Sequence, residues 1–185
     1  MRIIFLDIDG PMIPDQIHLL PGDEKFPLKK VTHFGCFSKF SPYSVAFIKT
    51  LCDGYGAKVL TNSTHNMSGK DHIKKLFEVN GLNPDQYLHS DIMTEFKNGI
   101  DERDVAVCKW ILENQPESFV IIDDALEQDY DAELGQLWGI NASSLYGLTI
   151  QDRERAIKLL LKRKKDKSLT EEDYKLIEEI YTENI

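Results

Sequence analysis

Two pairs of aspartates are the residues of this sequence best suited to chemistry. Asp7 and Asp9 close the first apolar run of the chain, and Asp123 and Asp124 close a later one. Carboxylates brought close together cannot all stay ionised without a cation. Their oxygens are hard ligands, and Mg²⁺ commonly binds one or two of them together with waters and a substrate phosphate. No His or Cys stands beside either pair, which argues against zinc.

Short apolar runs predict the strands that must position these aspartates. The runs are Arg2–Leu6, Lys58–Leu60 and Phe119–Ile122, and the second of them ends at Thr61 and Asn62. In an open α/β sheet, ligands bind outside the carboxyl ends of the strands. Parallel strands place those ends on one edge, so we expect all these polar residues to converge there.

Helical patterns alternate with the apolar runs, and this alternation is typical of parallel strands joined by crossover helices. It predicts a three-layer α/β/α Rossmann-like fold with a mainly parallel sheet. Ser41 as N-cap and Pro42 at the first helical position begin the first helix, which Gly54 and Gly56 end. Further helices are expected over residues 70–79, 101–114 and 149–163, the last with a capping-box start, and a final helix from residue 168 or 170, with residues 136–142 as an edge strand.

The spacing of these elements predicts a single domain over residues 1–185, ending in a C-terminal helix over 168–185. The segment from Gly10 to Lys39 is broken by Pro and Gly, so we expect an irregular flap over residues 11–40 rather than a helical cap. Between Thr64 and Asp101 we expect one helix and a loop. An open site without a large cap domain follows.

Composition sets the broad class of the protein. The chain has 185 residues, of which 42% are hydrophobic and 29% charged, a normal globular balance. Its net charge of −9 argues against a protein whose main task is to coat nucleic acid. A basic cluster over residues 158–167 is best interpreted as a solvated helix face. The sequence lacks a long apolar run and a signal peptide, and its three cysteines are scattered, so we expect a cytoplasmic protein without a membrane segment.

The polar strand ends also resemble a known family. Asp7-Ile8-Asp9-Gly10, Thr61, a downstream basic residue and Asp123-Asp124 are similar to the four motifs of the haloacid dehalogenase (HAD) superfamily. The similarity covers roughly residues 2–157. Within the superfamily the chain most resembles the capless HAD domain of Swiss army knife RNA-repair proteins, on the evidence of Ser41-Pro42, Trp110 and Gly147-Leu148-Thr149. Those proteins often carry serines and then Trp-Arg where this chain has Thr61-Asn62-Ser63-Thr64-His65.

The resemblance implies catalytic roles for several of these residues. Asp7 is then the nucleophile, which forms an aspartyl-phosphate. Asp9 protonates the leaving oxygen and later takes a proton from the attacking water. The superfamily's dehalogenases lack this second aspartate, so its presence favours phosphate esters. Thr61 holds a phosphoryl oxygen through its hydroxyl, with Ser63 as an alternative.

The resemblance also implies a Mg²⁺ site. Asp7, the backbone carbonyl of Asp9, and Asp123 bind the ion, and Asp124 is a further ligand or supports one. Gly10 and Asn62 are candidates for binding substrate.

The basic third motif has three candidates. Spacing favours Arg103, near the start of its expected helix, over Lys109 and Lys70. Lys109 is also a candidate for contacting the substrate phosphate. His65, just beyond the second motif, is the histidine with the best chance of touching substrate.

Together the residues and the resemblance predict a Mg²⁺-dependent phosphomonoester hydrolase. Its substrate is expected to be a phosphorylated small molecule or a nucleic-acid end. An enzymatic alternative is an end-processing phosphatase that acts on RNA or DNA termini in repair. The alternative from another class is a non-catalytic binding module that keeps the fold and metal site.

Overall fold

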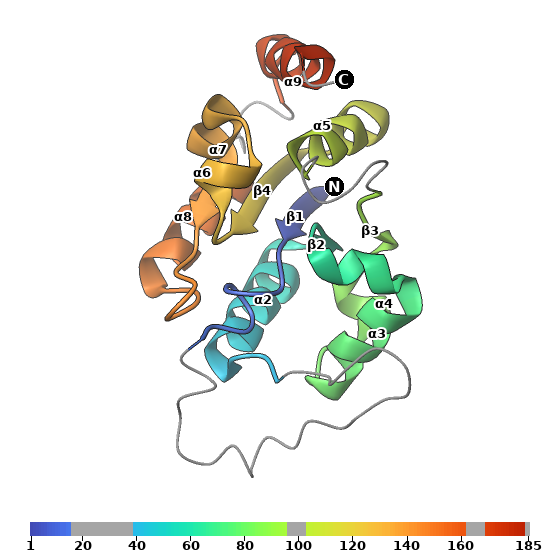
Figure 1. The fold of residues 1–185 in the computed structure, drawn as a ribbon, viewed down its shortest axis with the longest axis vertical. Helices are drawn as coiled ribbons and strands as arrows, with labels where there is room; N and C mark the ends of the chain where they lie inside the picture. Colours follow the sequence, from blue (N-terminus) through green and yellow to red (C-terminus); the bar gives the residue numbers. More distant parts are fainter. Residues whose placement is uncertain (16–38, 96–102, 162–168, 184–185) are drawn as a thin grey trace.

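The computed structural model describes residues 1–15, 39–95, 103–161 and 169–183. In these residues the chain forms a five-stranded, all-parallel sheet with strand order β3-β2-β1-β4-β5 (Figure 1). The strands are β1 (Arg2–Leu6), β2 (Ala57–Thr61), β3 (Leu88–Met93), β4 (Ser118–Asp123) and β5 (Gly139–Asn141). The expected α/β fold with a parallel sheet is therefore confirmed.

Helices of the described chain cover both faces of the sheet (Figure 1). One face packs against α2 (Pro42–Tyr55), α3 (Lys70–Val79) and α8 (Ile150–Leu161). The other packs against α5 (Arg103–Asn114), α6 (Leu126–Asp129), α7 (Ala132–Trp138) and α9 (Glu171–Glu183). The short helices η2 (Thr64–Ser68) and α4 (Pro84–Tyr87) lie in the connections on either side of α3.

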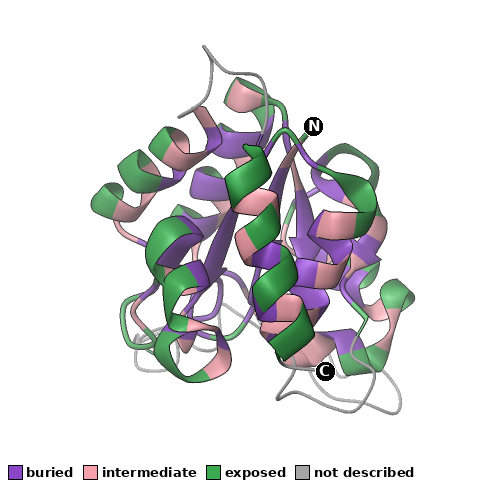
Figure 2. Cartoon of the chain, turned by 90° about the horizontal axis from the view of Figure 1, so that it is seen from above, coloured by how far each residue is buried: buried purple, intermediate pink, exposed green. Residues whose placement is uncertain are grey.

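The central strand β1 explains the three layers. Successive side chains of a strand point to opposite faces of a sheet. Ile4 and Leu6 accordingly belong to the core beneath α2, α3 and α8, whereas Ile3 and Phe5 belong to the core beneath α5 and α7. All four residues are fully buried. Figure 2 shows the buried strands at the centre, with helices on both sides that are buried on one face and exposed on the other.

Strand register aligns the polar strand ends. Leu6 pairs with Thr61 on β2 and with Ile122 on β4. The backbone N–H of Asp7 donates to Ile122 O at 2.9 Å, and that of Asn62 donates to Leu6 O at 2.9 Å. The parallel pairing therefore places the residues after β1, β2 and β4 at the same edge.

Most of the expected helix ends are confirmed. Helix α2 begins after Ser41 with Pro42 at its first turn, although it runs through Gly54 and ends at Gly56, whose φ of 67° is the left-handed conformation that glycine favours. The capping box before α8 is present, since the Thr149 N–H and hydroxyl both donate to Asp152 Oδ2 at 2.7 Å.

One expectation between these elements was wrong, and another is confirmed only in part. The interval 64–101 holds a strand, β3, in addition to its helices; it pairs with β2 through a register shift, and Ile92 has a positive φ of 71°. This irregular, half-polar edge strand lacks the apolar run that marked the others. The expected edge strand over 136–142 is confirmed over residues 139–141, which form β5, whereas residues 136–138 are the end of helix α7.

Two further expectations concern residues that the structure does not describe. The expected flap over 11–40 falls largely on residues 16–38, and the basic cluster over 158–167 falls largely on 162–168; both lie outside the described residues. No described helix is long and apolar enough to cross a membrane.

Burial makes two thiols chemically inert. Cys52 and Cys108 are buried, and burial raises the pKa of each thiol to about 12. Because the thiolate is the reactive form, we expect both to react with Ellman's reagent at about pH 8 at least ~1000-fold more slowly than an exposed thiol. The measurement uses Cys36→Ser, so that only these two thiols report, before and after unfolding in guanidinium chloride. Rapid labelling of the folded variant would contradict the packing of α2 and α5.

Candidate active site

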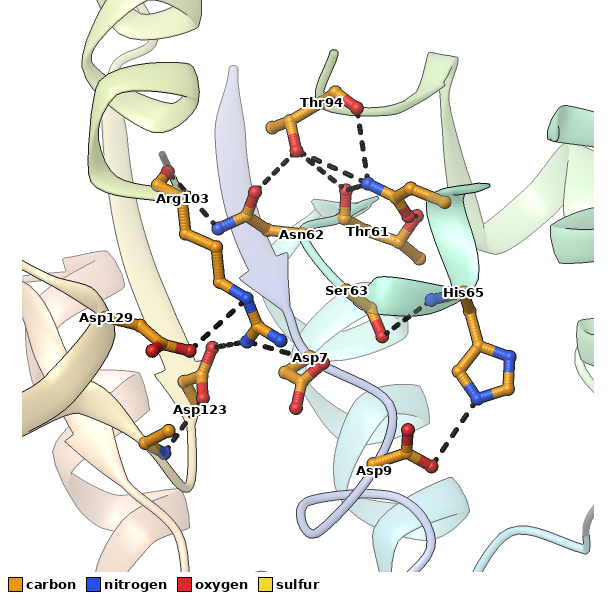
Figure 3. Close-up of polar contacts among 12 residues, drawn as sticks. Asp7, Asp9, Thr61, Asn62, Ser63, His65, Thr94, Arg103, Asp123 and Asp129 are labelled. Atoms are coloured by element: carbon orange, nitrogen blue, oxygen red, sulfur yellow. Dashed lines mark hydrogen bonds and ion pairs between the residues drawn. The ribbon is translucent and has the colours of Figure 1, made fainter. Parts of the chain in front are cut away.

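The candidate site lies at the carboxyl edge of the sheet (Figure 3). Asp7 follows β1 and Asp123 is the last residue of β4; their exposed fractions are 3% and 0%. Carboxylate oxygens of Asp7, Asp123 and Asp124 lie within 4.8 Å of one another. The structure thus gathers three of the four predicted aspartates into one cluster, which we call the carboxylate cluster.

Gly10 allows the cluster to close. Its φ of 73° is in the left-handed region, and an added Cβ would lie 2.3 Å from Cγ of Asp124. No other residue fits this turn without displacing the Asp124 carboxylate. Gly10 therefore packs against the cluster, which is a more specific role than the substrate contact expected from sequence.

Arg103 supplies the positive charge of the site. Its Nη1 lies 2.6 Å from Asp123 Oδ2 and 3.6 Å from Asp7 Oδ1, and its Nε lies 3.4 Å from Asp129 Oδ2. The side chain is only 6% exposed, and it reaches the cluster from the first residue of α5 (Figure 3). Of the three candidates for the basic motif, Arg103 is the one that the structure places against the cluster.

Lys109, expected to contact the substrate phosphate, pairs with a glutamate of its own helix rather than with the carboxylate cluster. Its Nζ lies 3.8 Å from Glu113 Oε1, one turn further along α5. Lys109 and Lys70 line a hollow between α3, β3 and α5, together with Asp91 and Trp110. The spacing along α5 explains the difference, because Lys109 stands six residues beyond Arg103 and more than one turn further from the strand ends.

Burial and mutual repulsion shift the acidity of the cluster. Burial, together with the charge of Asp123, raises the pKa of Asp7 to about 8 even though Arg103 and a hydrogen bond from Ser63 oppose the shift. Burial likewise raises the pKa of Asp123 and of Asp124. Burial alone would lower the pKa of Arg103, but the charges of Asp7 and Asp123 outweigh it and raise that pKa. One guanidinium does not balance three carboxylates.

The cluster fits a hard divalent cation. Asp7 Oδ1 is buried and accepts no hydrogen bond, and a buried oxygen without a partner is costly unless an ion or water meets it. The donor set is all carboxylate oxygen, which Mg²⁺ prefers over the nitrogen and sulfur ligands of zinc. The residues therefore suit Mg²⁺, with Asp7, Asp123 and Asp124 to hold it.

Asp9 lies apart from the carboxylate cluster. Its side chain is 63% exposed, and its Oδ1 lies 3.4 Å from His65 Nε2. This hydrogen bond is the main reason that the pKa of Asp9 is lowered, and the Thr64 hydroxyl contributes a further bond. Both partners come from η2, directly after β2. The predicted metal ligand at this position is the backbone carbonyl of Asp9, not its carboxyl. The carboxyl hydrogen-bonds with His65 and Thr64 of η2.

The second motif is arranged differently from the expectation. The Thr61 hydroxyl is fully buried and donates to Asn66 Oδ1 at 2.7 Å, on the side of β3. Ser63 instead hydrogen-bonds the carboxyl of Asp7, and its Oγ accepts from the His65 backbone N–H at 3.4 Å. The placement favours Ser63, the alternative to Thr61, as the hydroxyl beside the nucleophile position.

Asn62 was expected to bind substrate but is fully buried. Its Nδ2 donates to the Tyr130 hydroxyl at 2.6 Å, its Oδ1 accepts from the Thr94 hydroxyl, and the Tyr130 hydroxyl donates to Asp123 Oδ2 at 3.1 Å. Asn62 therefore orients Asp123 through Tyr130 rather than facing a ligand (Figure 3 shows Asn62, Thr94 and Asp123).

Comparison with known proteins agrees with this geometry. Residues 3–153 match the family model described as the HAD domain in Swiss Army Knife RNA repair proteins. The chain belongs to this HAD family. No curated protein and no solved structure matches the chain. The expected superfamily and subfamily are both confirmed.

Sequence reasoning missed the residues that support the motifs of this HAD domain: Asn66, Thr94, Asp129 and Tyr130. Each stands several residues or more from the motif residue that it contacts. The sequence carried one faint signal, the run of polar residues from Thr64 to Asn66 directly after the second motif.

Tyr130 should matter for metal binding. Tyr130→Phe removes the hydroxyl that links Asn62 to Asp123 without changing the packing of the ring. Groups that orient metal ligands typically contribute about 10- to 100-fold to affinity, and we expect the variant to bind Mg²⁺ about tenfold more weakly. Isothermal titration calorimetry measures this affinity. Tyr146→Phe, which alters an exposed ring, is the control, and equal affinities for the wild type and Tyr130→Phe would refute the link.

Asp7 should make the stability of the metal-free protein depend on pH. The pKa of Asp7 is about 8 in the folded protein and near 3.8 in the unfolded chain. At a pH between these two values, unfolding therefore releases a proton from Asp7. Stability then falls as the pH rises from about 4 towards 8 and levels off above it. Asp7→Asn removes this term. The melting temperature of Asp7→Asn in EDTA should exceed that of the wild type, and the difference should grow as the pH rises from about 4 to about 8. A difference that does not depend on pH would contradict the raised pKa of Asp7.

Proposed function

We propose that this HAD domain is a Mg²⁺-dependent phosphomonoester hydrolase whose nucleophile is Asp7. The observation that carries the proposal is the environment of the Asp7 carboxyl. It is buried beside Asp123, faces Arg103 at 3.6 Å, and accepts a hydrogen bond from Ser63. A nucleophilic carboxylate needs such positive charge and donors, because the phosphate it attacks is itself an anion.

The proposed reaction has two steps. A carboxylate oxygen of Asp7 attacks phosphorus, the bond from phosphorus to the ester oxygen breaks, and Asp9 gives that oxygen a proton. Water then attacks the phosphorus of the aspartyl-phosphate and passes a proton to Asp9. The bond from phosphorus to Asp7 breaks, which releases inorganic phosphate and restores both carboxyls.

Neighbouring groups would stabilise the charge that moves in these steps. Arg103 and the Ser63 hydroxyl lie where they could bind oxygens of the transferred phosphoryl group. Mg²⁺, held by Asp7, Asp123 and Asp124, would offset the repulsion between the phosphate and the nucleophile. Tyr130 and Asn62 keep Asp123 oriented for this purpose.

The proposed substrate is a phosphorylated nucleic-acid end. The family of this domain occurs in RNA repair proteins, and removal of a terminal phosphate is a step that such repair requires. A phosphorylated small molecule is the competing substrate class. The alternative of a non-catalytic binding module is less well supported, because Arg103 contacts Asp123 and the aspartates of the first and last motifs lie together.

Phosphate release tests the proposal directly. Wild-type protein with Mg²⁺ should release phosphate from p-nitrophenyl phosphate and from oligoribonucleotides phosphorylated at the 3′ or 5′ end. Asp7→Asn keeps the shape of the side chain but removes the nucleophile, so activity should fall by at least about 1000-fold. EDTA should abolish activity, and added Mg²⁺ should restore it.

Lys109→Ala is the matched control, because Lys109 pairs with Glu113 away from the cluster. It should retain wild-type activity. Activity of Asp7→Asn equal to that of the wild type would exclude Asp7 as the nucleophile. A wild type that binds phosphorylated ends but never releases phosphate would point to the binding module instead.

A further inference from the structure

The geometry points to His65 as a positioning residue for Asp9, supported in turn by His72. We propose that this pair fixes the Asp9 carboxyl for proton transfer to and from the ester oxygen. The inference rests on the proposed phosphatase function and adds two residues to it that lie outside the recognised motifs.

The contact runs from the sheet edge into α3 as a chain of three side chains. His65 Nε2 lies 3.4 Å from Asp9 Oδ1, and His65 Nδ1 lies 3.2 Å from His72 Nε2. The two imidazole rings are stacked, with centroids 5.4 Å apart and planes 12° apart. Figure 3 shows the His65 ring directed at Asp9, away from Arg103 and the carboxylate cluster.

Hydrogen-bond chemistry fixes the direction of this chain. An ionised carboxylate only accepts hydrogen bonds, so His65 Nε2–H donates to Asp9. In a neutral ring the other nitrogen is then an acceptor, and His72 Nε2–H donates to His65 Nδ1. Each donor is thus matched by an acceptor, and the hydrogen bond of one ring nitrogen fixes the tautomer of the ring. His65 can turn only if it loses the bond from His72.

Global stability does not explain this arrangement. The Asp9 side chain is 63% exposed and that of His65 is 22% exposed. An exposed pair of this kind contributes little to the free energy of unfolding, since water competes for both partners. A free surface carboxylate would sample several rotamers, yet Asp9 is held by both His65 and Thr64. What the bonds do provide is a fixed direction for a carboxyl that stands two residues from the nucleophile.

A fixed direction matters most when the leaving group is poor. The alkoxide of a ribose or sugar departs only with a proton, so its release depends on a well-placed acid. The nitrophenolate of p-nitrophenyl phosphate departs without one. Loss of the histidine should therefore slow hydrolysis of alkyl phosphates selectively, whereas general damage to the site would slow both reactions.

The test compares His65→Leu and His65→Gln on a 3′-phosphorylated oligoribonucleotide and on p-nitrophenyl phosphate. Leu fills similar space without a donor, whereas the amide of Gln places a donor near the position of Nε2. We expect His65→Leu to lower kcat on the oligonucleotide by about 10- to 100-fold and on p-nitrophenyl phosphate by less than about threefold. His65→Gln should recover most of the loss. His72→Phe, which keeps a stacked ring but no donor, should show a smaller selective loss.

Two further measurements separate positioning from damage. The melting temperature and the Mg²⁺ affinity of His65→Leu should match those of the wild type, because the hydrogen bonds of the His65 ring are to Asp9 and His72 and not to Asp7, Asp123 or Asp124. His89→Leu, which removes a histidine that contacts Trp110 instead, is the control and should show no selective loss.

Equal losses of kcat on both substrates, or no loss on either, would overturn the positioning role while leaving the nucleophile intact. Failure of the proposed function has a different signature, which is full activity in Asp7→Asn or none in the wild type, and either result would overturn this inference as well.

Discussion

The buried contact between Arg103 and the carboxylates of Asp7 and Asp123 is the interaction on which the rest of the site depends. Three carboxylates and one guanidinium share a region almost closed to water, where repulsion between like charges is strong. Arg103 offsets part of that repulsion and leaves the remainder for a cation. The raised pKa of Asp7 in the metal-free protein expresses this incomplete balance.

Hydrogen bonds around this charged centre restrict each acid separately. Asp123 accepts from Arg103, from Tyr130 and from the backbone N–H of Ala125, so its carboxyl has no freedom to turn. Asp9 is restrained from the other side, by η2 and the histidine pair. The two sets of restraints do not share residues. The fold therefore separates a buried region suited to binding the ion from a half-open region suited to proton transfer.

The short element η2 has more influence than its length suggests. It follows β2 directly and supplies Ser63 as its N-cap, Thr64 and His65 to Asp9, and Asn66 to Thr61. Ser63 is the N-cap and has an extended backbone, with φ of −140° and ψ of 156°, whereas Asn66 lies within the helical turn. Ser63 meets Asp7 while Asn66 is buried against β2 and Thr94. This division of roles explains why Thr61, though it ends the strand, does not offer its hydroxyl to the site.

The sequence by itself predicted the parallel sheet, the edge at which the candidate site lies, and Asp7, Asp9, Asp123 and Asp124 as its acids. It favoured Arg103 as the basic residue but left Lys109 and Lys70 as alternatives. Apolar periodicity and strand-end polarity are local properties, so they are readable in one dimension. The sequence could not reveal β3, because an irregular edge strand has a half-polar pattern. It could not exclude Lys109 either, because the sequence of α5 does not tell how far each of its residues lies from the strand ends. The choice of Ser63 over Thr61, the burial of Asn62 and the roles of Tyr130 and His72 were decided only by tertiary structure. Each depends on the direction of a side chain towards a partner far away along the chain, and packing alone fixes that direction.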